Sequence, residues 1–214
     1  MKPQLPGSFA TVRLGVAAVA GYAVGSVLTA DLVSRLAARR NGTAVDLRAT
    51  GSGNPGAANA MANLGTNWGI AVLAGDIIKG AAGAQLGRAL AGDAGAYLAA
   101  SAAVVGHCFP AWSGFRGGKG VATSAGTTFV CFPAYVPIDI GLVAVSWLAS
   151  RHAGKATAGA SAAFVLAAFA WYRFRLPNAW GTGPTAGLPL YAVATAAIIG
   201  YKFLSAPRHF GNNK

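Results

Sequence analysis

Long apolar stretches alternate along this chain with short polar stretches that are rich in glycine or basic residues. The apolar stretches cover residues 9–38, 67–91, 94–108, 120–134, 136–151, 157–174 and 187–206. Their length and spacing predict an all-α integral membrane protein, a single polytopic domain over residues 1–214 with about seven transmembrane or partly spanning helices. The stretches around Pro133 and Pro137 are short for a straight crossing of a roughly 30 Å hydrocarbon core, so we expect them to be tilted, re-entrant or joined within the protein.

The composition narrows the class of protein. Of the 214 residues, 54% are hydrophobic and only 10% are charged, which excludes an ordinary soluble domain. The net charge is +12, but the basic residues lie mostly at the ends of apolar stretches, so we expect no nucleic-acid partner. All five acidic residues are aspartates, which excludes mechanisms that need a glutamate base. Cys108 and Cys131 have no metal-ligand spacing, and we expect no metal and no cofactor.

The basic residues also predict an orientation. If the glycine-rich loops at residues 51–56 and 106–120 face the cytoplasm, eleven basic residues lie on that side and five on the other, in agreement with the positive-inside bias. An odd number of crossings then places the N-terminus outside, with the C-terminus and both loops on the cytoplasmic side. The many Ala and Gly residues, as in Gly83 and Gly87, predict close approach of helix backbones.

The loop at residues 106–120 carries the most informative chemistry. Gly117, Gly118 and Gly120 let backbone N–H groups approach an anion closely, and Lys119 adds a positive charge. A helix that opens at this point would add its N-terminal dipole. The loop lacks the spacing and the hydroxyl residue of a Walker loop. It therefore predicts a phosphate site at the edge of the membrane.

A second glycine-rich loop lies upstream, at residues 51–56. Its glycines fit the G-x-G-x-x-G pattern, but the preceding residues 46–50 do not form a strand pattern, so a dinucleotide fold is rejected. Two interpretations remain, an anion-binding nest and a tight polar turn before a helix. The candidate ligands of the nest are Gly51, Ser52, Gly53, Asn54, Gly56 and Asn59.

Three further groups are candidates for the site. Asp76 and Lys79 lie three residues apart in an apolar helix and can pair, either as part of a polar site or as a structural ion pair. His107 can act as a general base, bind phosphate or simply pack at a helix end. The C-terminal Arg208 and His209 belong either to a solvated basic tail or to a tail that folds back onto the loops.

Taken together, these segments resemble the bacterial acyl-phosphate:glycerol-3-phosphate acyltransferase family, PlsY, nearly from end to end. Three motifs and an intervening D-x-x-K-G helix carry the resemblance. The first motif is matched by Gly51, Ser52, Gly53, Asn54, Gly56, Ala57 and Asn59, the helix by Asp76, Lys79 and Gly80, the second motif by Gly106, His107, Phe109, Pro110, Phe115, Gly117, Gly118, Lys119, Gly120, Val121, Ala122 and Thr123, and the third by Arg208, His209 and Asn212.

The resemblance implies a seven-helix fold in the bacterial cytoplasmic membrane and transfer of a fatty acyl group from acyl phosphate to the 1-hydroxyl of glycerol 3-phosphate. It implies that Lys119 and the 117–120 amides hold one phosphate and that the first and third motifs hold the other. The residues implied to be catalytic are Ser52, His107, Lys119 and His209. Those implied to bind substrate are Gly51, Gly53, Asn54, Gly56, Asn59, Asp76, Lys79, Gly117, Gly118, Gly120, Thr123, Arg208 and Asn212.

The first motif departs from the family at two positions. Ala58 stands where threonine is usual, and Ala62 stands where arginine is usual. Losing a charge-assisted contact to phosphate costs about 1.5 to 3 kcal/mol, and Arg48 is a candidate substitute. The alternatives to the enzyme are therefore a relative that binds or transports a phosphorylated lipid and a transferase with another acceptor.

Overall fold

The computed structural model describes residues 7–42, 44–150 and 153–205, and these residues form helices joined by loops and turns. The helices are α1 (Gly7–Ser26), α2 (Thr29–Asn41), α3 (Ala57–Leu64), α4 (Thr66–Cys108), α5 (Val121–Cys131), α6 (Val136–Ser150), α7 (Ala153–Phe174) and α8 (Gly187–Leu204), with 3₁₀ turns at Ala111–Ser113 and Pro133–Tyr135. Within these described ranges, three segments are long and apolar enough to cross a membrane, or four if a bent pair counts as one span. The predicted all-helical membrane fold is confirmed.

Each predicted apolar stretch corresponds to helix, with two differences. The stretch at residues 9–38 is divided at Val27 and Leu28 into α1 and α2. The eight-residue helix α3 follows the first glycine-rich loop, and none of the predicted apolar stretches covers it. A segment of eight residues is too short for its hydrophobic periodicity to identify a helix, which explains why α3 was not predicted.

Helix α4 consists of two arms joined by a break. Ala91 and Gly92 have non-helical dihedral angles, and Gly92 has a φ of +65°, which favours glycine. The arms, residues 66–90 and 93–108, fold back on one another, and a Cβ at Gly87 would collide with the carbonyl oxygen of Gly95. Helix α1 packs as closely on the second arm, since a Cβ at Gly21 would collide with the backbone of Ala99. The predicted close approach of backbones is therefore confirmed.

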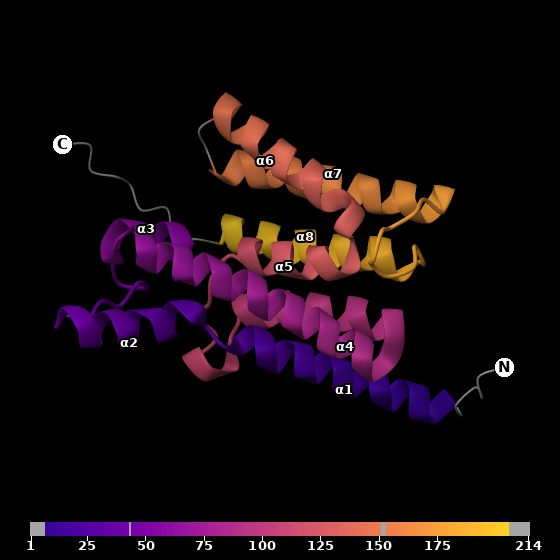
Figure 1. Cartoon of the computed structure of the whole chain (residues 1–214), viewed down its shortest axis with the longest axis horizontal. Coiled ribbons are helices and arrows are strands. Elements are labelled where there is room, and N and C mark those ends of the chain that lie inside the picture. The colour runs from indigo at the N-terminus through magenta and orange to yellow at the C-terminus, as the bar shows by residue number, and fades with distance from the viewer. Residues whose placement is uncertain (1–6, 43, 151–152, 206–214) are drawn as a thin grey trace.

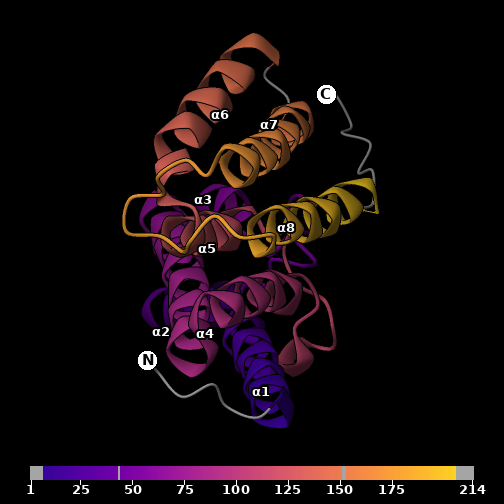
Figure 2. The same ribbon diagram turned by 90° about the vertical axis from the view of Figure 1, so that its right-hand side faces the viewer.

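The helices lie in layers that can be followed in both views. Helices α6 and α7 form one side, α5 and α8 lie beneath them, and α4 and α1 complete the opposite side (Figures 1 and 2). Helix α5 and the segment Pro133–Leu142 meet at 117°. Phe132 and Pro133 lie at this bend, where proline is incompatible with a continuing helix. The two short stretches around Pro133 thus meet at a sharp bend, which is the geometry of a broken span or a re-entrant loop.

Both glycine-rich loops lie at one end of the bundle. Helix α1 begins at the opposite end, whereas α3, the loop after α4 and the C-terminal end of α8 lie together (Figure 1). Both loops therefore lie beside the same end of the layer of α5 and α8. The polar groups of the loops adjoin the apolar interior at this end.

Candidate active site

A cavity of about 850 Å³ extends from the two loops into the space between α5, α6, α7 and α8. Its polar end is formed by the first loop, the start of α3, α4 and the second loop. Its lining includes Ser52, Asn54, Gly56, Asn59, Asp76, His107, Lys119 and Gly120 at this end, and Ala125, Thr128, Asp139, Ile140, Ala144, Ala160, Phe164 and Thr195 further in. The structure thus brings together residues from both loops and from α4 in one cavity.

The first loop is held in shape by the side chain of Asn59. The Asn59 amide donates to the carbonyl oxygens of Leu47 and Thr50, at 2.8 and 2.9 Å, and its oxygen accepts from the backbone N–H of Ser52 at 3.1 Å. Asn63 donates to the same oxygen at 2.9 Å. Every polar atom of the Asn59 side chain is therefore occupied by the protein. Asn59 shapes the loop rather than offering a free donor.

The other residues of the first motif divide into two groups. Ser52, Asn54 and Gly56 line the cavity. Gly51 and Gly53 do not line it, and their φ angles of +60° and +68° show why glycine is needed, since a side chain would be strained there. The two glycines therefore shape the turn that presents Ser52 and Asn54.

Asp76, Lys79 and His107 form a buried cluster between the two arms of α4, beside the break between α1 and α2. Lys79 Nζ lies 2.9 Å from Asp76 Oδ1 and also donates to the carbonyl oxygen of Val27 at 2.8 Å. Val27 lies at the break between α1 and α2, so Lys79 pairs with an acid and satisfies a freed carbonyl at once. Asp76 and His107 line the cavity, whereas Lys79 does not. The predicted pairing of Asp76 with Lys79 is confirmed.

His107 lies close to Asp76 and against the second loop. Its Nδ1 is 3.5 Å from Asp76 Oδ1, without the geometry of a hydrogen bond. The backbone N–H of Gly118 donates to the His107 carbonyl oxygen at 3.2 Å. A Cβ at Gly117 would collide with that carbonyl oxygen, and one at Gly118 would collide with Nε2 of the ring. The two glycines are therefore needed for space, because the loop lies directly on His107.

Lys119 and the start of α5 form the cationic part of the cavity. Gly120 has a φ of +86° and precedes the first turn of α5, whose N-terminus has no side-chain cap. Lys119 Nζ lies 4.3 Å from the centre of the Phe203 ring, and burial lowers the pKa of Lys119. Lys119, Gly120 and Val121 all line the cavity. An ammonium group and an open helix N-terminus thus face the same space, which is an arrangement that binds phosphate.

Arg48 does not replace the arginine that is missing at Ala62. Its guanidinium donates to both carboxylate oxygens of Asp31, at 2.8 and 2.9 Å, and its Nε donates to the carbonyl oxygen of Arg116 at 2.9 Å. The hydrogen bond to Asp31 raises the pKa of Arg48. The side chain fastens α2 to both loops and does not line the cavity. Three of the five guanidinium N–H donors of Arg48 are therefore used within the protein, which argues against Arg48 as the substitute for an arginine at position 62.

The remaining predicted residues lie elsewhere. Thr123 is buried in α5 and does not line the cavity, and a Cβ at Gly80 would collide with its carbonyl oxygen. Ala58 lines the cavity, and Ala62 is exposed one turn further along α3. Arg208, His209 and Asn212 fall outside the described residues. No group of His, Cys, Asp or Glu within the described ranges has the arrangement of a metal site.

Several cavity residues are absent from the sequence-based site. Asp139, Phe164 and Thr195 come from α6, α7 and α8 and line the inner part. Asp139, a carboxylate in an apolar stretch, was the only local signal for this group. The others are indistinguishable in sequence from residues that face lipid, because their position depends on how the helices pack.

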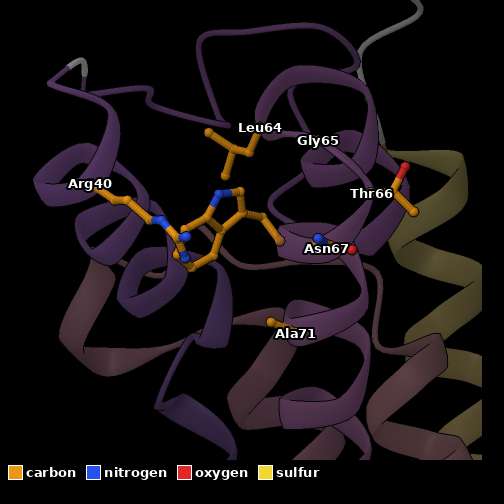
Figure 3. Close-up of a pocket in the computed structure, with 7 residues that line it drawn as sticks. Arg40, Leu64, Gly65, Thr66, Asn67 and Ala71 are labelled. Carbon is orange, nitrogen blue, oxygen red and sulfur yellow. The ribbon is translucent and has the colours of Figure 1, made fainter.

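A second cavity, of about 440 Å³, lies at the corner between α2, α3 and the start of α4. Figure 3 shows Arg40, Leu64, Thr66 and Ala71 around it. None of the predicted site residues lines it. The larger cavity is therefore the candidate active site.

The fold and the larger cavity define a class of protein, a helical membrane protein that can hold an anionic headgroup at the loops and an apolar chain between its helices. The sequence profile described as "Glycerol-3-phosphate acyltransferase" matches residues 15–212. The chain therefore belongs to the glycerol-3-phosphate acyltransferase family.

Individual relatives agree with this assignment. A glycerol-3-phosphate acyltransferase of Erythrobacter litoralis is 37% identical over 191 residues, covering 86% of this chain and 85% of the relative. One of Jannaschia sp. is 36% identical over 199 residues, covering 93% and 87%. One of Rubrobacter xylanophilus is 44% identical over 142 residues, covering 64% and 66%. The similarity thus extends over most of the chain.

Two solved structures have the same fold. Both are crystal structures of PlsY, described as an integral membrane glycerol 3-phosphate acyltransferase. Its glycerol 3-phosphate form has a TM-score of 0.75 at 27% identity and covers 89% of this chain and 88% of that one. Its lysophosphatidic acid form has a TM-score of 0.73 at 26% identity, with 88% and 87% covered. The membrane fold is thus shared with PlsY.

Proposed function

We propose that this protein transfers a fatty acyl group from acyl phosphate to the 1-hydroxyl of glycerol 3-phosphate, giving lysophosphatidic acid and inorganic phosphate. The observation that carries the proposal is that Lys119 and the first loop lie at one end of the larger cavity, with apolar helices at the other end. Both proposed substrates carry a phosphate, and one also carries an alkyl chain. The cavity offers a suitable environment for each part.

The two phosphates are assigned to different parts of the polar end. Lys119, the amides around Gly120 and the N-terminus of α5 hold the phosphate of acyl phosphate, so that the acyl chain follows α5 into the apolar part. Ser52 and Asn54, with His209 and Asn212 of the C-terminal tail, hold glycerol 3-phosphate. Its 1-hydroxyl then lies between the loops, near the acyl carbonyl carbon.

The reaction is a displacement at that carbon. The hydroxyl oxygen forms the new ester bond, the bond from the carbonyl carbon to the phosphate oxygen breaks, and inorganic phosphate leaves with the electron pair. A phosphate oxygen of a substrate accepts the hydroxyl proton. Catalysis rests on positioning and on stabilisation of the developing charge. His107 is the alternative base, but it is 3% exposed and lies against Asp76 and the second loop.

The runner-up function is a relative that binds or transports a phosphorylated lipid, or that uses another acceptor. Ala58 and Ala62 favour it, because both lie on the helix that follows the first loop. Purified protein given acyl phosphate and radiolabelled glycerol 3-phosphate separates these functions. We expect labelled lysophosphatidic acid and one equivalent of phosphate. Tight binding of substrate without this product would support the runner-up.

We propose the bacterial cytoplasmic membrane as the location, with the N-terminus outside and both loops on the cytoplasmic side. The excess of basic residues at the loop end supports this orientation. The test is a single new cysteine, Gln4→Cys, because Cys108 and Cys131 are both 0% exposed and give little background. We expect labelling by an impermeant reagent in intact cells. Labelling only in permeabilised cells would show that the N-terminus lies inside, opposite to the proposed orientation.

A further inference from the structure

Thr195 of α8 carries a buried hydroxyl that has no partner among the residues that the structure describes. The residue is 2% exposed and lines the cavity, and its Oγ1 forms no hydrogen bond with the described protein. Among the buried threonines of α5, Thr127 and Thr128 both pair with the Tyr191 hydroxyl, at 2.7 and 3.1 Å. Thr123 is also unpaired within the described residues, but it does not line the cavity. Leaving a buried polar group unpaired is unfavourable, and such groups are rare in folded proteins. The hydroxyl of Thr195 therefore needs an acceptor that the described residues do not provide.

The pairing of α5 with α8 fixes the depth of Thr195. Two contacts show how the helices are aligned. Near the loops, a Cβ on Gly120 would lie 3.4 Å from Ile199 of α8. Further inside, Thr127 and Thr128 of α5 bond to Tyr191 of α8. Residue numbers rise along α5 as they fall along α8, so the two helices are antiparallel. Thr195 lies midway between Ile199 and Tyr191, about one helical turn, or about 5 Å, inward from the level of Gly120.

This depth is the boundary between the two ends of the cavity. Lys119 and Gly120 lie on the loop side of Thr195, while Ala125 and Phe164 belong to the apolar part. In an acyl phosphate the carbonyl group is bonded directly to the phosphate. A phosphate held by the backbone amides at Gly120 and the N-terminus of α5 therefore places the carbonyl oxygen at about the level of Thr195, with the alkyl chain continuing inward.

We propose that Thr195 is a further catalytic residue, whose hydroxyl donates a hydrogen bond to the carbonyl oxygen of acyl phosphate. This proposal rests on the proposed function. When the acceptor hydroxyl attacks, the carbonyl π electrons move onto this oxygen, which becomes negatively charged. They return when the bond to phosphate breaks. A hydrogen bond that strengthens as the charge develops lowers the barrier to the reaction. Threonine in a helix has two accessible χ1 rotamers, so the hydroxyl can turn toward the substrate.

The test compares Thr195→Val, Thr195→Ser and Thr182→Val. Valine preserves the shape of threonine without its hydroxyl, and serine preserves the hydroxyl. Thr182 is the matched control, because it is 0% exposed and donates to the Cys131 carbonyl oxygen at 2.8 Å, outside the cavity. The measurements are kcat, the KM for glycerol 3-phosphate and the melting temperature in detergent, using acyl phosphate as the donor.

For Thr195→Val we expect kcat to fall about 100-fold with an unchanged KM for glycerol 3-phosphate, as for loss of one donor to a developing oxyanion. Its melting temperature is equal to or above that of the wild type, because no internal hydrogen bond is lost. Thr195→Ser retains most of the activity. Thr182→Val shows the opposite pattern, a lower melting temperature with wild-type kcat.

Wild-type kcat in Thr195→Val overturns the proposal. So does a fall in both kcat and melting temperature that serine does not restore, since that pattern indicates a structural role. A wild-type protein that forms no lysophosphatidic acid rejects the proposed function itself, and the role of Thr195 fails with it. An active wild type with an equally active Thr195→Val rejects only the role of Thr195.

Discussion

The two glycine-rich loops look alike in sequence, but Gly51 and Gly53 of the first are needed for a different physical reason from Gly117 and Gly118 of the second. In the first loop, Gly51 and Gly53 have positive φ angles, and the turn is held by hydrogen bonds to Asn59. In the second, Gly117 and Gly118 are needed because a Cβ on either would collide with His107. The first loop is held by Asn59, at the start of the helix that directly follows it. The shape of the second loop is limited by its contact with His107 of α4. Damage to each should therefore have different effects on the protein.

The largest expected effect is at the cationic residue of the second loop. Lys119→Ala removes the ammonium group that faces the cavity, and we expect kcat/KM to fall about 1,000-fold without loss of the fold. The control is Lys202→Ala, because Lys202 lies 4.9 Å from the Phe109 ring centre and does not line the cavity. Near-normal turnover of Lys119→Ala in the acyl phosphate assay would reject the second loop as the phosphate site.

Gly118→Ala tests the need for space in the second loop. The added Cβ forces either the loop or the His107 ring to move, and a displacement of about 1 Å at a reacting group can cost about 100-fold in rate. We expect a loss of that order in kcat. Gly200→Ala in α8 is the control, since nothing lies within 4 Å of its Cβ position. Equal activity of the two variants would show that the contact with His107 has no effect on the reaction.

Asn59→Ala tests the self-organisation of the first loop. It removes the side-chain hydrogen bonds with Leu47, Thr50 and Ser52, so Ser52 and Asn54 are no longer held toward the cavity. We expect the KM for glycerol 3-phosphate to rise about 10-fold, with a smaller change in the KM for acyl phosphate. Equal changes in both KM values would show that the loops do not serve separate substrates.

The smallest expected effect is a gain of affinity at Ala62, in the second turn of α3. Ala62→Arg installs a cation on the exposed face of α3, one turn from Ala58 in the cavity wall. We expect the KM for glycerol 3-phosphate to fall up to about 10-fold with little change in kcat, as for added uniform binding. A higher KM for glycerol 3-phosphate in Ala62→Arg would show that the acceptor site is adapted to alanine at this position.

The polar end of the cavity was largely predictable from sequence, and its apolar part was not. Lys119, Gly120 and Asp76, which line the cavity, stand out because charge and clustered glycine are rare beside or within apolar stretches. Thr195 and Phe164 give no such signal, since only the packing of α5, α7 and α8 separates a cavity wall from a lipid-facing surface. Asn59 lines the cavity and also bonds to the backbone of the first loop, and the sequence does not separate these roles, because a short amide has the same appearance whether it binds a ligand or the backbone.

The contact between Lys79 and Val27 has a consequence for the reorganisation energy of the site. Lys79 joins the break between α1 and α2 to Asp76, and Asp31 of α2 in turn holds Arg48 and Ser113 of the loop segments. The elements that carry the loops are thereby fixed relative to α4 before any substrate arrives. Binding energy from the substrates is then not consumed in assembling the loops and remains available for lowering the barrier.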